Sequence, residues 1–142
     1  MGYAALVERT VPVSRKKVYA LLVDDFGNIG KIMGEAVESC RLEGEGIGSI
    51  RHVKARGSND VLSERLDAAL DGQLMSYSLV SPSSLPIEYY NAVVTLRDAP
   101  GGGCTIAWGS NWKPKGAPED SVRRMLNGLY GGIIDALVKA AG

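Results

Sequence analysis

The sequence has little of what metal, phosphate and nucleic-acid chemistry require. It has one histidine and two cysteines, Cys40 and Cys104, so a histidine-rich metal site is excluded and a disulfide framework is not expected. Its 16 basic and 16 acidic residues cancel, and without a basic face we expect no nucleic-acid partner. The glycine run at 101–103 lacks the Lys-Ser/Thr and the strand-to-helix context of a phosphate-binding loop. We therefore expect no metal and no cofactor.

Long hydrophobic runs are also missing. No apolar stretch approaches the roughly 20 residues of a membrane span, and the first residues do not place a charged leader before an apolar stretch, as a signal peptide would. A chain of 142 residues fits one domain with a proper core, but not two. These features predict a single cytoplasmic domain over 1–142 that does not insert stably into membranes.

The sequence does contain a regular succession of strand patterns between helical segments. Ser14 is a suitable N-cap for a short helix, and Asp71-Gly72 between two alternating segments is typical of a two-residue hairpin. A long loop with two prolines, over 81–86, interrupts the strands, and loops of this kind often carry function. The expected strands lie near 4–10, 35–42, 48–55, 60–70, 73–81, 89–98 and 104–113, and the expected helices near 14–23, 29–33 and 118–140.

The last helix has one apolar face and an unusual glycine cluster. At 100° per residue, glycines at 128, 131 and 132 fall away from the apolar face, although each costs roughly 1 kcal/mol against alanine in a helix. Two interpretations stay open: close backbone contact with another chain, as in a homodimer or a partner-binding module, or a helix that opens locally. The predicted apolar face consists of Val122, Leu126, Leu129, Tyr130, Ile133 and Leu137.

Strand parity predicts which side chains of the sheet face inward. Because successive residues of a strand face opposite sides, the apolar set in each segment marks one face. Turn positions predict three cross-strand pairs, Leu66 with Tyr77, Arg51 with Glu64, and Tyr90 with Trp112. The predicted inward residues are Arg51, Val53, Ala55, Leu62, Glu64, Leu66, Ala68, Leu70, Met75, Tyr77, Leu79, Tyr90, Ala92, Val94, Leu96, Cys104, Ile106, Trp108, Ser110 and Trp112.

This inward face is mostly apolar with a few polar groups, which is typical of a small-molecule pocket. Glu64 is the single charge on its strand's inner face, and three interpretations of it stay open. It could form only a structural ion pair with Arg51, contact a ligand directly or through water, or act as a general acid or base in catalysis.

Four segments carry a family resemblance: residues 48–51 (Gly-Ser-Ile-Arg), 63–67 (Ser-Glu-Arg-Leu-Asp), 76–79 (Ser-Tyr-Ser-Leu) and the Tyr89-Tyr90 pair. With the order of elements, they resemble the START-like, or SRPBCC, superfamily, within it the polyketide cyclase/dehydrase and lipid transport group, and they are similar to the plant abscisic acid receptors. The resemblance implies an α+β helix-grip fold. In this fold a curved seven-stranded antiparallel sheet wraps around a long C-terminal helix, with two short helices after the first strand.

The same resemblance implies roles for particular residues. Glu64 matches a pocket glutamate that reaches ligand through water, and Leu85 falls in a latch-like loop. The lysine that pairs with the hormone carboxylate in the receptors would fall at Gly34, and the proline-bearing gate is reduced to 56–59, so we do not expect abscisic acid binding. Tyr77, Leu79, Tyr90, Ala92, Leu126, Tyr130 and Ile134 match positions around the receptor cavity.

The sequence thus predicts a protein that binds a small, largely hydrophobic molecule, such as a lipid, isoprenoid, aromatic or polyketide-like compound, between the sheet and the last helix. The alternative is a cyclase/dehydrase-like enzyme that uses the same cavity with Glu64 as acid or base; whether the protein is an enzyme stays open. The predicted ligand-binding residues are Arg51, Val53, Leu62, Glu64, Tyr77, Leu79, Leu85, Tyr90, Ala92, Trp108, Ser110, Leu126 and Tyr130.

Overall fold

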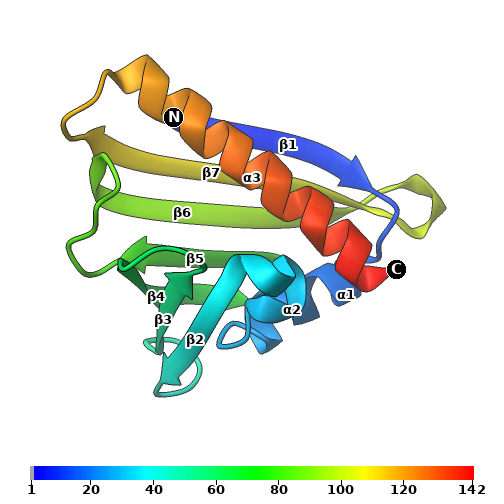
Figure 1. Ribbon diagram of the computed structural model, residues 1–142. Helices are drawn as coiled ribbons and strands as arrows, with labels where there is room; N and C mark the ends of the chain where they lie inside the picture. The colour runs from blue at the N-terminus through cyan, green and yellow to red at the C-terminus, as the bar shows by residue number, and fades with distance from the viewer. Residues whose placement is uncertain (1) are drawn as a thin grey trace.

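The computed structural model describes residues 2–142 and contains the predicted order of elements (Figure 1). The strands are β1 (Ala5–Val11), β2 (Val37–Glu43), β3 (Ile50–Ala55), β4 (Val61–Leu70), β5 (Leu74–Leu79), β6 (Ile87–Asp98) and β7 (Cys104–Pro114). The helical segments are α1 (Arg15–Tyr19), η1 (Ala20–Asp24), α2 (Gly30–Met33), η2 (Gly34–Ala36), η3 (Pro100–Gly102) and α3 (Glu119–Ala141).

The strands form one antiparallel sheet in the order β1-β7-β6-β5-β4-β3-β2. Figure 1 shows α3 lying across β6, β7 and β1, while the sheet curves so that β2 and β3 stand apart from that layer. The short helices α1 and α2 lie near the C-terminal end of α3. The predicted helix-grip fold is confirmed.

The first helical segment begins where Ser14 was predicted to cap it. The Ser14 Oγ accepts a hydrogen bond from the Lys17 backbone N–H at 3.2 Å, which satisfies one of the free donors of the first turn. The helix then widens into a single π-helical turn, η1, and this turn buries Leu21 and Leu22. Turns of this type are often found at functional sites.

The last helix packs its predicted apolar face against the sheet. Of that face, Leu129 alone stays exposed, at 47%, and it lines the cavity described below. Glu119 and Asp120 bring negative charge to the first turn, which favours the positive end of the helix dipole. Among residues 2–142, no helix is both long and apolar enough to cross a membrane.

The missing side chain at Gly131 leaves space for Arg9 of β1 to pass over α3. A Cβ added at Gly131 would lie 3.0 Å from Nη2 of Arg9, and Nη1 of Arg9 donates to Asp135 Oδ1 at 3.1 Å. A Cβ added at Gly128 or Gly132 would meet nothing within 4 Å. Gly131 therefore serves a contact within the chain, which neither of the sequence interpretations included.

Two of the three predicted cross-strand pairs form. Leu66 lies opposite Tyr77, and Arg51 lies opposite Glu64. The sheet therefore brings Arg51, Glu64 and Tyr77 to one place on its inner face.

The inward prediction fails at the end of β4, where the register shifts between Leu66 and Ala68. The turn is also longer than predicted: Leu70 pairs with Leu74, which leaves three residues, 71–73, in the loop. The bulge and the longer loop compensate each other, so Leu66 still meets Tyr77. Beyond the bulge, Ala69 pairs with the buried Met75, and Ala68 and Leu70 face outward, Leu70 being 55% exposed.

The register predicted for the third pair, Tyr90 with Trp112, is the one that β6 and β7 keep, but a bulge falls at the pair itself, so Tyr89 and Tyr90 together lie opposite Trp112. The β6–β7 register runs unbroken from Asp98 to Asn91 and then shifts before Glu88. Tyr89 takes up this irregularity with φ 56°, unusual for a residue other than glycine, and its side chain is 81% exposed. Tyr90 still faces inward and is buried.

Candidate functional site

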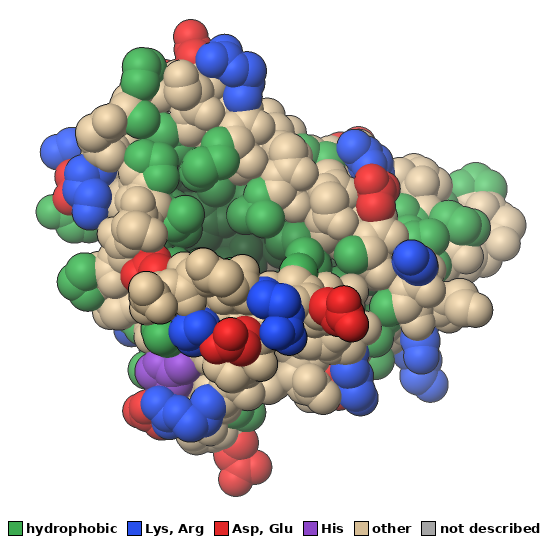
Figure 2. Space-filling model, viewed as in Figure 1, with side chains coloured by type: hydrophobic (Ala, Val, Ile, Leu, Met, Phe, Trp, Pro, Cys, Tyr) green, Lys and Arg blue, Asp and Glu red, His purple; other side chains and the backbone are tan. Residues whose placement is uncertain are grey.

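The curvature of the sheet leaves a cavity of about 240 Å³ between the strands, α3 and the short helices. Figure 2 shows its opening as a hollow lined by hydrophobic side chains. An engineered apolar cavity of about 150 Å³ already takes up benzene, so this space is large enough for a small molecule. The lining comprises Leu21, Leu22, Ile29, Ile32, Met33, Ala36, Val37, Arg51, Val53, Ala55, Leu62, Glu64, Met75, Tyr77, Leu79, Leu85, Ile87, Tyr90, Trp108, Leu126, Leu129 and Ile133.

The charged groups of the cavity lie on the inner face of β3 and β4, beside Tyr77 of β5. Arg51 Nε donates to Glu64 Oε1 at 2.9 Å, and Arg51 Nη1 donates to the Phe26 carbonyl at 3.3 Å. The guanidinium carbon lies 4.1 Å from the centre of the Phe26 ring and 5.4 Å from that of Tyr77. The predicted Arg51–Glu64 ion pair is confirmed, and the side chain of each partner is largely buried, with 7% and 16% exposed.

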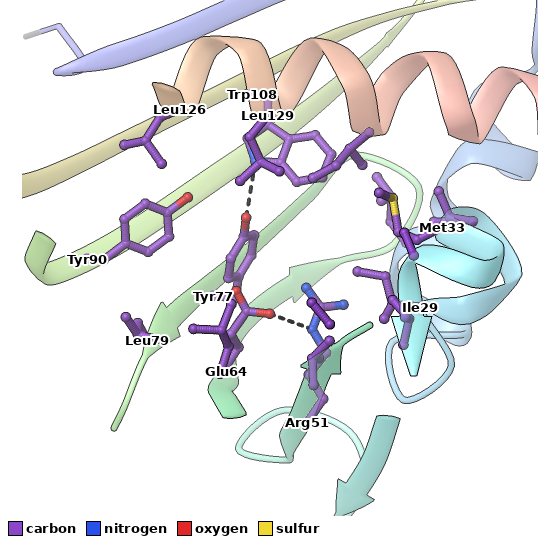
Figure 3. A pocket seen from close by; sticks show the side chains of 18 of the residues that line it. Ile29, Met33, Arg51, Glu64, Tyr77, Leu79, Tyr90, Trp108, Leu126 and Leu129 are labelled. Atoms are coloured by element: carbon purple, nitrogen blue, oxygen red, sulfur yellow. Dashed lines mark hydrogen bonds and ion pairs between the residues drawn. The ribbon is translucent and has the colours of Figure 1, made fainter. Parts of the chain in front are cut away.

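Glu64 keeps one carboxylate oxygen free. Its Oε1 accepts from Arg51, whereas no hydrogen bond from another residue of 2–142 reaches its Oε2. Figure 3 shows the Glu64 carboxylate beside Tyr77, on the cavity side of the sheet. A ligand in the cavity can therefore reach an acceptor oxygen that the protein itself leaves without a donor.

Two further groups of hydrogen bonds hold the aromatic wall. Trp108 Nε1 donates to the Tyr77 hydroxyl at 3.2 Å, as Figure 3 shows. Tyr90, which also lines the cavity, shares a hydrogen bond with Tyr130, and the deeper Tyr130 donates to Ser110 Oγ at 2.7 Å. Burial raises the pKa of Tyr77, Tyr90 and Tyr130 above the ordinary tyrosine value, so these hydroxyls stay protonated at neutral pH.

Most of the predicted site residues line the cavity. Three predicted residues, Ala92, Ser110 and Tyr130, do not: each is fully buried, at 0% exposure. Tyr130 stacks on Trp108 with ring centres 5.6 Å apart, so the Trp108 ring lies between Tyr130 and the cavity. The predicted residues that do line it are Arg51, Val53, Leu62, Glu64, Tyr77, Leu79, Leu85, Tyr90, Trp108 and Leu126.

Sequence reasoning missed the wall contributed by the short helices. Ile29, Ile32 and Met33 enter the cavity from α2 and the residue before it, as do Leu21 and Leu22 from η1. The signal was present in the apolar spacing at 29, 32 and 33, which places three large side chains on one face of a helix. A helix of only four residues has no stable apolar face alone, so these side chains must pack against other elements of the fold.

The loop over 81–86 closes one side of the cavity and is tied to the turn between β3 and β4. Ser84 donates to Asp60 Oδ2 twice, through its backbone N–H at 3.0 Å and its hydroxyl at 2.8 Å. The backbone hydrogen bond, followed by the side-chain one, lowers the pKa of Asp60. Leu85, next to Ser84, reaches into the cavity, so this contact fixes part of the rim.

No group of three or more histidine, cysteine, aspartate or glutamate side chains in the described part of the chain lies close enough to hold a metal ion. The arrangement offers instead a mostly apolar space with several aromatic rings and one carboxylate oxygen, Oε2 of Glu64, to which no described residue donates.

Comparison with known proteins identifies a family over nearly the whole chain. The family described as "Polyketide cyclase / dehydrase and lipid transport" matches residues 5–142. No curated protein matches the sequence significantly.

Solved structures share the fold at low sequence identity. The protein XoxI from Bacillus cereus is 18% identical, with 99% of this chain and 96% of that chain covered and a TM-score of 0.83. Ara h 8.0201 is 24% identical, with 96% and 95% covered and a TM-score of 0.80. A truncated norcoclaurine synthase from Thalictrum flavum is 15% identical, with 94% and 89% covered and a TM-score of 0.71. At these identities the likeness establishes the fold alone.

Proposed function

The chain belongs to the polyketide cyclase/dehydrase and lipid transport family, and on this basis we propose that it binds one small, largely hydrophobic molecule in the cavity between the sheet and α3. The observation that carries the proposal is the cavity itself, about 240 Å³ with mostly apolar walls and a few polar groups on one side. Pockets for small organic molecules have this composition.

The walls of the cavity give a physical reason for binding. Native cores contain few voids larger than a water molecule, whereas this space measures about 240 Å³ and opens at the surface. Without a ligand its apolar walls face water. A bound apolar molecule removes that surface from water, which is favourable at roughly 25 cal/mol per Å², and for this reason binding explains the cavity better than imperfect packing does.

Binding is favoured over the cyclase/dehydrase alternative by the composition of the cavity wall. No histidine, cysteine or lysine of residues 2–142 lines it, so Glu64 has no second proton carrier beside it other than tyrosines whose pKa is raised by burial. Glu64 is also engaged by Arg51. These contacts suit a group that orients a ligand better than one that transfers protons.

Two neighbouring residues of β4 provide a direct test. Leu62 lines the cavity, whereas Val61 faces outward and is 42% exposed. Leu62→Trp should fill the space and abolish binding of neutral apolar probes such as 2-naphthol and 1-decanol, while Val61→Trp should bind them as the wild type does. Calorimetry and ligand-induced thermal stabilisation measure the difference. Equal binding by the two variants, or no binding of either probe by the wild type, would refute the proposal.

A further inference from the structure

The charges of the cavity lining cancel within a single contact. Arg51 and Glu64 are the only charged residues of 2–142 in that lining, and they are bonded to each other at 2.9 Å. The cavity is thus electrically balanced before any ligand enters it, and the ion pair leaves one acceptor free, Oε2 of Glu64.

We infer that the ligand carries an uncharged hydrogen-bond donor, an alcohol or phenol hydroxyl, which donates to Glu64 Oε2, and that the cavity rejects carboxylates. This inference rests on the proposed function and names the chemical class of its ligand.

The donor follows from the chemistry of the free oxygen. An ionised carboxylate can only accept hydrogen bonds, and Arg51 occupies Oε1 alone. An apolar molecule without a donor would cover Oε2 and leave it without the hydrogen bonds that water otherwise supplies, which costs binding free energy. A hydroxyl replaces that water and leaves the rest of the ligand free to contact the apolar walls.

The rejection of carboxylates follows from the state of Arg51. Its Nε is bonded to Glu64, its Nη1 to the Phe26 carbonyl, and its guanidinium carbon lies 4.1 Å from the centre of the Phe26 ring. A ligand carboxylate would have to share this one cation with Glu64, and a second negative charge would then lie beside the first in a poorly hydrated space. Both the desolvation and the repulsion between like charges oppose such binding.

Three probes with the same ring system separate these effects: 2-naphthol, 2-methoxynaphthalene and 2-naphthoate, each titrated calorimetrically into the wild-type protein at neutral pH. We expect 2-naphthol to bind about tenfold or more tightly than 2-methoxynaphthalene, which lacks the donor, and 2-naphthoate to bind weakest. If 2-naphthoate binds as well as 2-naphthol, or if the ether does, the inference fails while cavity binding stands. If none of the three binds, cavity binding fails and the inference fails with it.

Glu64→Gln tests whether Glu64 causes the preference for 2-naphthol over 2-naphthoate. The substitution leaves the Arg51 cation without its anion, so we expect the order to invert, with 2-naphthoate tighter than 2-naphthol by about tenfold. Glu8→Gln, on β1 and paired with Arg97 at 3.8 Å, removes the same charge away from the cavity and should leave the wild-type order unchanged. An unchanged order in Glu64→Gln, confirmed as folded by circular dichroism, or an inverted order in Glu8→Gln, would overturn the inference.

Discussion

At Arg51 one guanidinium lies among a carboxylate, a backbone carbonyl and two aromatic rings. Desolvating two charges in this way often costs as much as their attraction returns, so a buried ion pair is weak evidence for stability. A role in ligand selection gives a better reason for placing this pair in an otherwise apolar cavity. The pairing itself was predictable, because the position of one turn fixed Arg51 opposite Glu64.

The buried tyrosines predict how stability depends on pH. Burial raises the pKa of Tyr77, Tyr90 and Tyr130 above the ordinary value of 10.0, so the folded chain holds these protons at a pH where the unfolded chain releases them. The free energy of unfolding is therefore unaffected by them below about pH 10 and falls as the pH rises above that value, by about 1.4 kcal/mol per pH unit for each tyrosine.

Two measurements check this. Urea unfolding at a series of alkaline pH values should give a falling stability, and Tyr90→Phe should reduce its slope by one proton. Tyrosinate absorbance from these three residues should rise only together with the loss of far-UV circular dichroism. Ionisation of buried tyrosines in a chain that keeps its full circular dichroism would contradict the prediction.

The three glycines of α3 differ in their surroundings, and this difference predicts different effects of alanine. Gly128 and Gly132 have open space where a Cβ would lie, so each substitution should raise the free energy of unfolding by up to about 1 kcal/mol and the melting temperature by a few degrees. Gly131→Ala should gain less, because its Cβ would lie 3.0 Å from Arg9 Nη2 and would displace Arg9 from Asp135.

Thermal unfolding of the three single variants measures this order. Sedimentation at matched concentration serves as the control, because it separates an effect on the helix from a change in self-association. Equal stabilisation by all three alanines would mean that Arg9 moves away at no cost, and that the Arg9 contact does not require a glycine at position 131.

Elements and their order could be predicted from the sequence, and local irregularities of the strands could not. Alternation of apolar residues fixes each strand and its inner face, but a bulge reverses the alternation without changing composition. For this reason Leu66 was placed correctly and Leu70 was not. The same limit applies at Tyr89, whose left-handed backbone breaks the register that would have paired Tyr90 with Trp112.

Site residues could be predicted where the pattern of a single strand shows which side chains face inward. They could not be predicted where the outcome depends on how deeply a side chain is buried or on where a helix packs. Strand parity puts Tyr77 and Ser110 on the inner face of the sheet, and helical periodicity puts Tyr130 on the apolar face of α3, yet Ser110 and Tyr130 lie behind the aromatic wall. Which of two inward residues reaches the cavity depends on the size of its neighbours. The contribution of Ile32 and Met33 depends on where α2 packs, which no local pattern specifies.

For the molecule as a whole, packing is uneven across the sheet. Strands β6 and β7 carry long series of buried residues, whereas β2 has none that is fully buried. The cavity lies between these two parts, since its lining runs from Trp108 and Leu126 on the well-packed side to Val37 and Val53 on the other. The less packed part is thus the one that a ligand can stabilise most.

Hydrogen exchange should reveal this asymmetry. Amides of β2 and β3 should exchange faster than those of β6 and β7 in the free protein, because local opening there exposes less buried apolar surface. Saturation with 2-naphthol should slow exchange in β3, α2 and η1, which meet at the cavity, and leave β1 unchanged. Leu62→Trp should show no such response to the probe. Protection spread evenly over all seven strands would instead mean that binding stabilises the fold globally. The cavity would then not separate a slowly exchanging part of the molecule from a rapidly exchanging one.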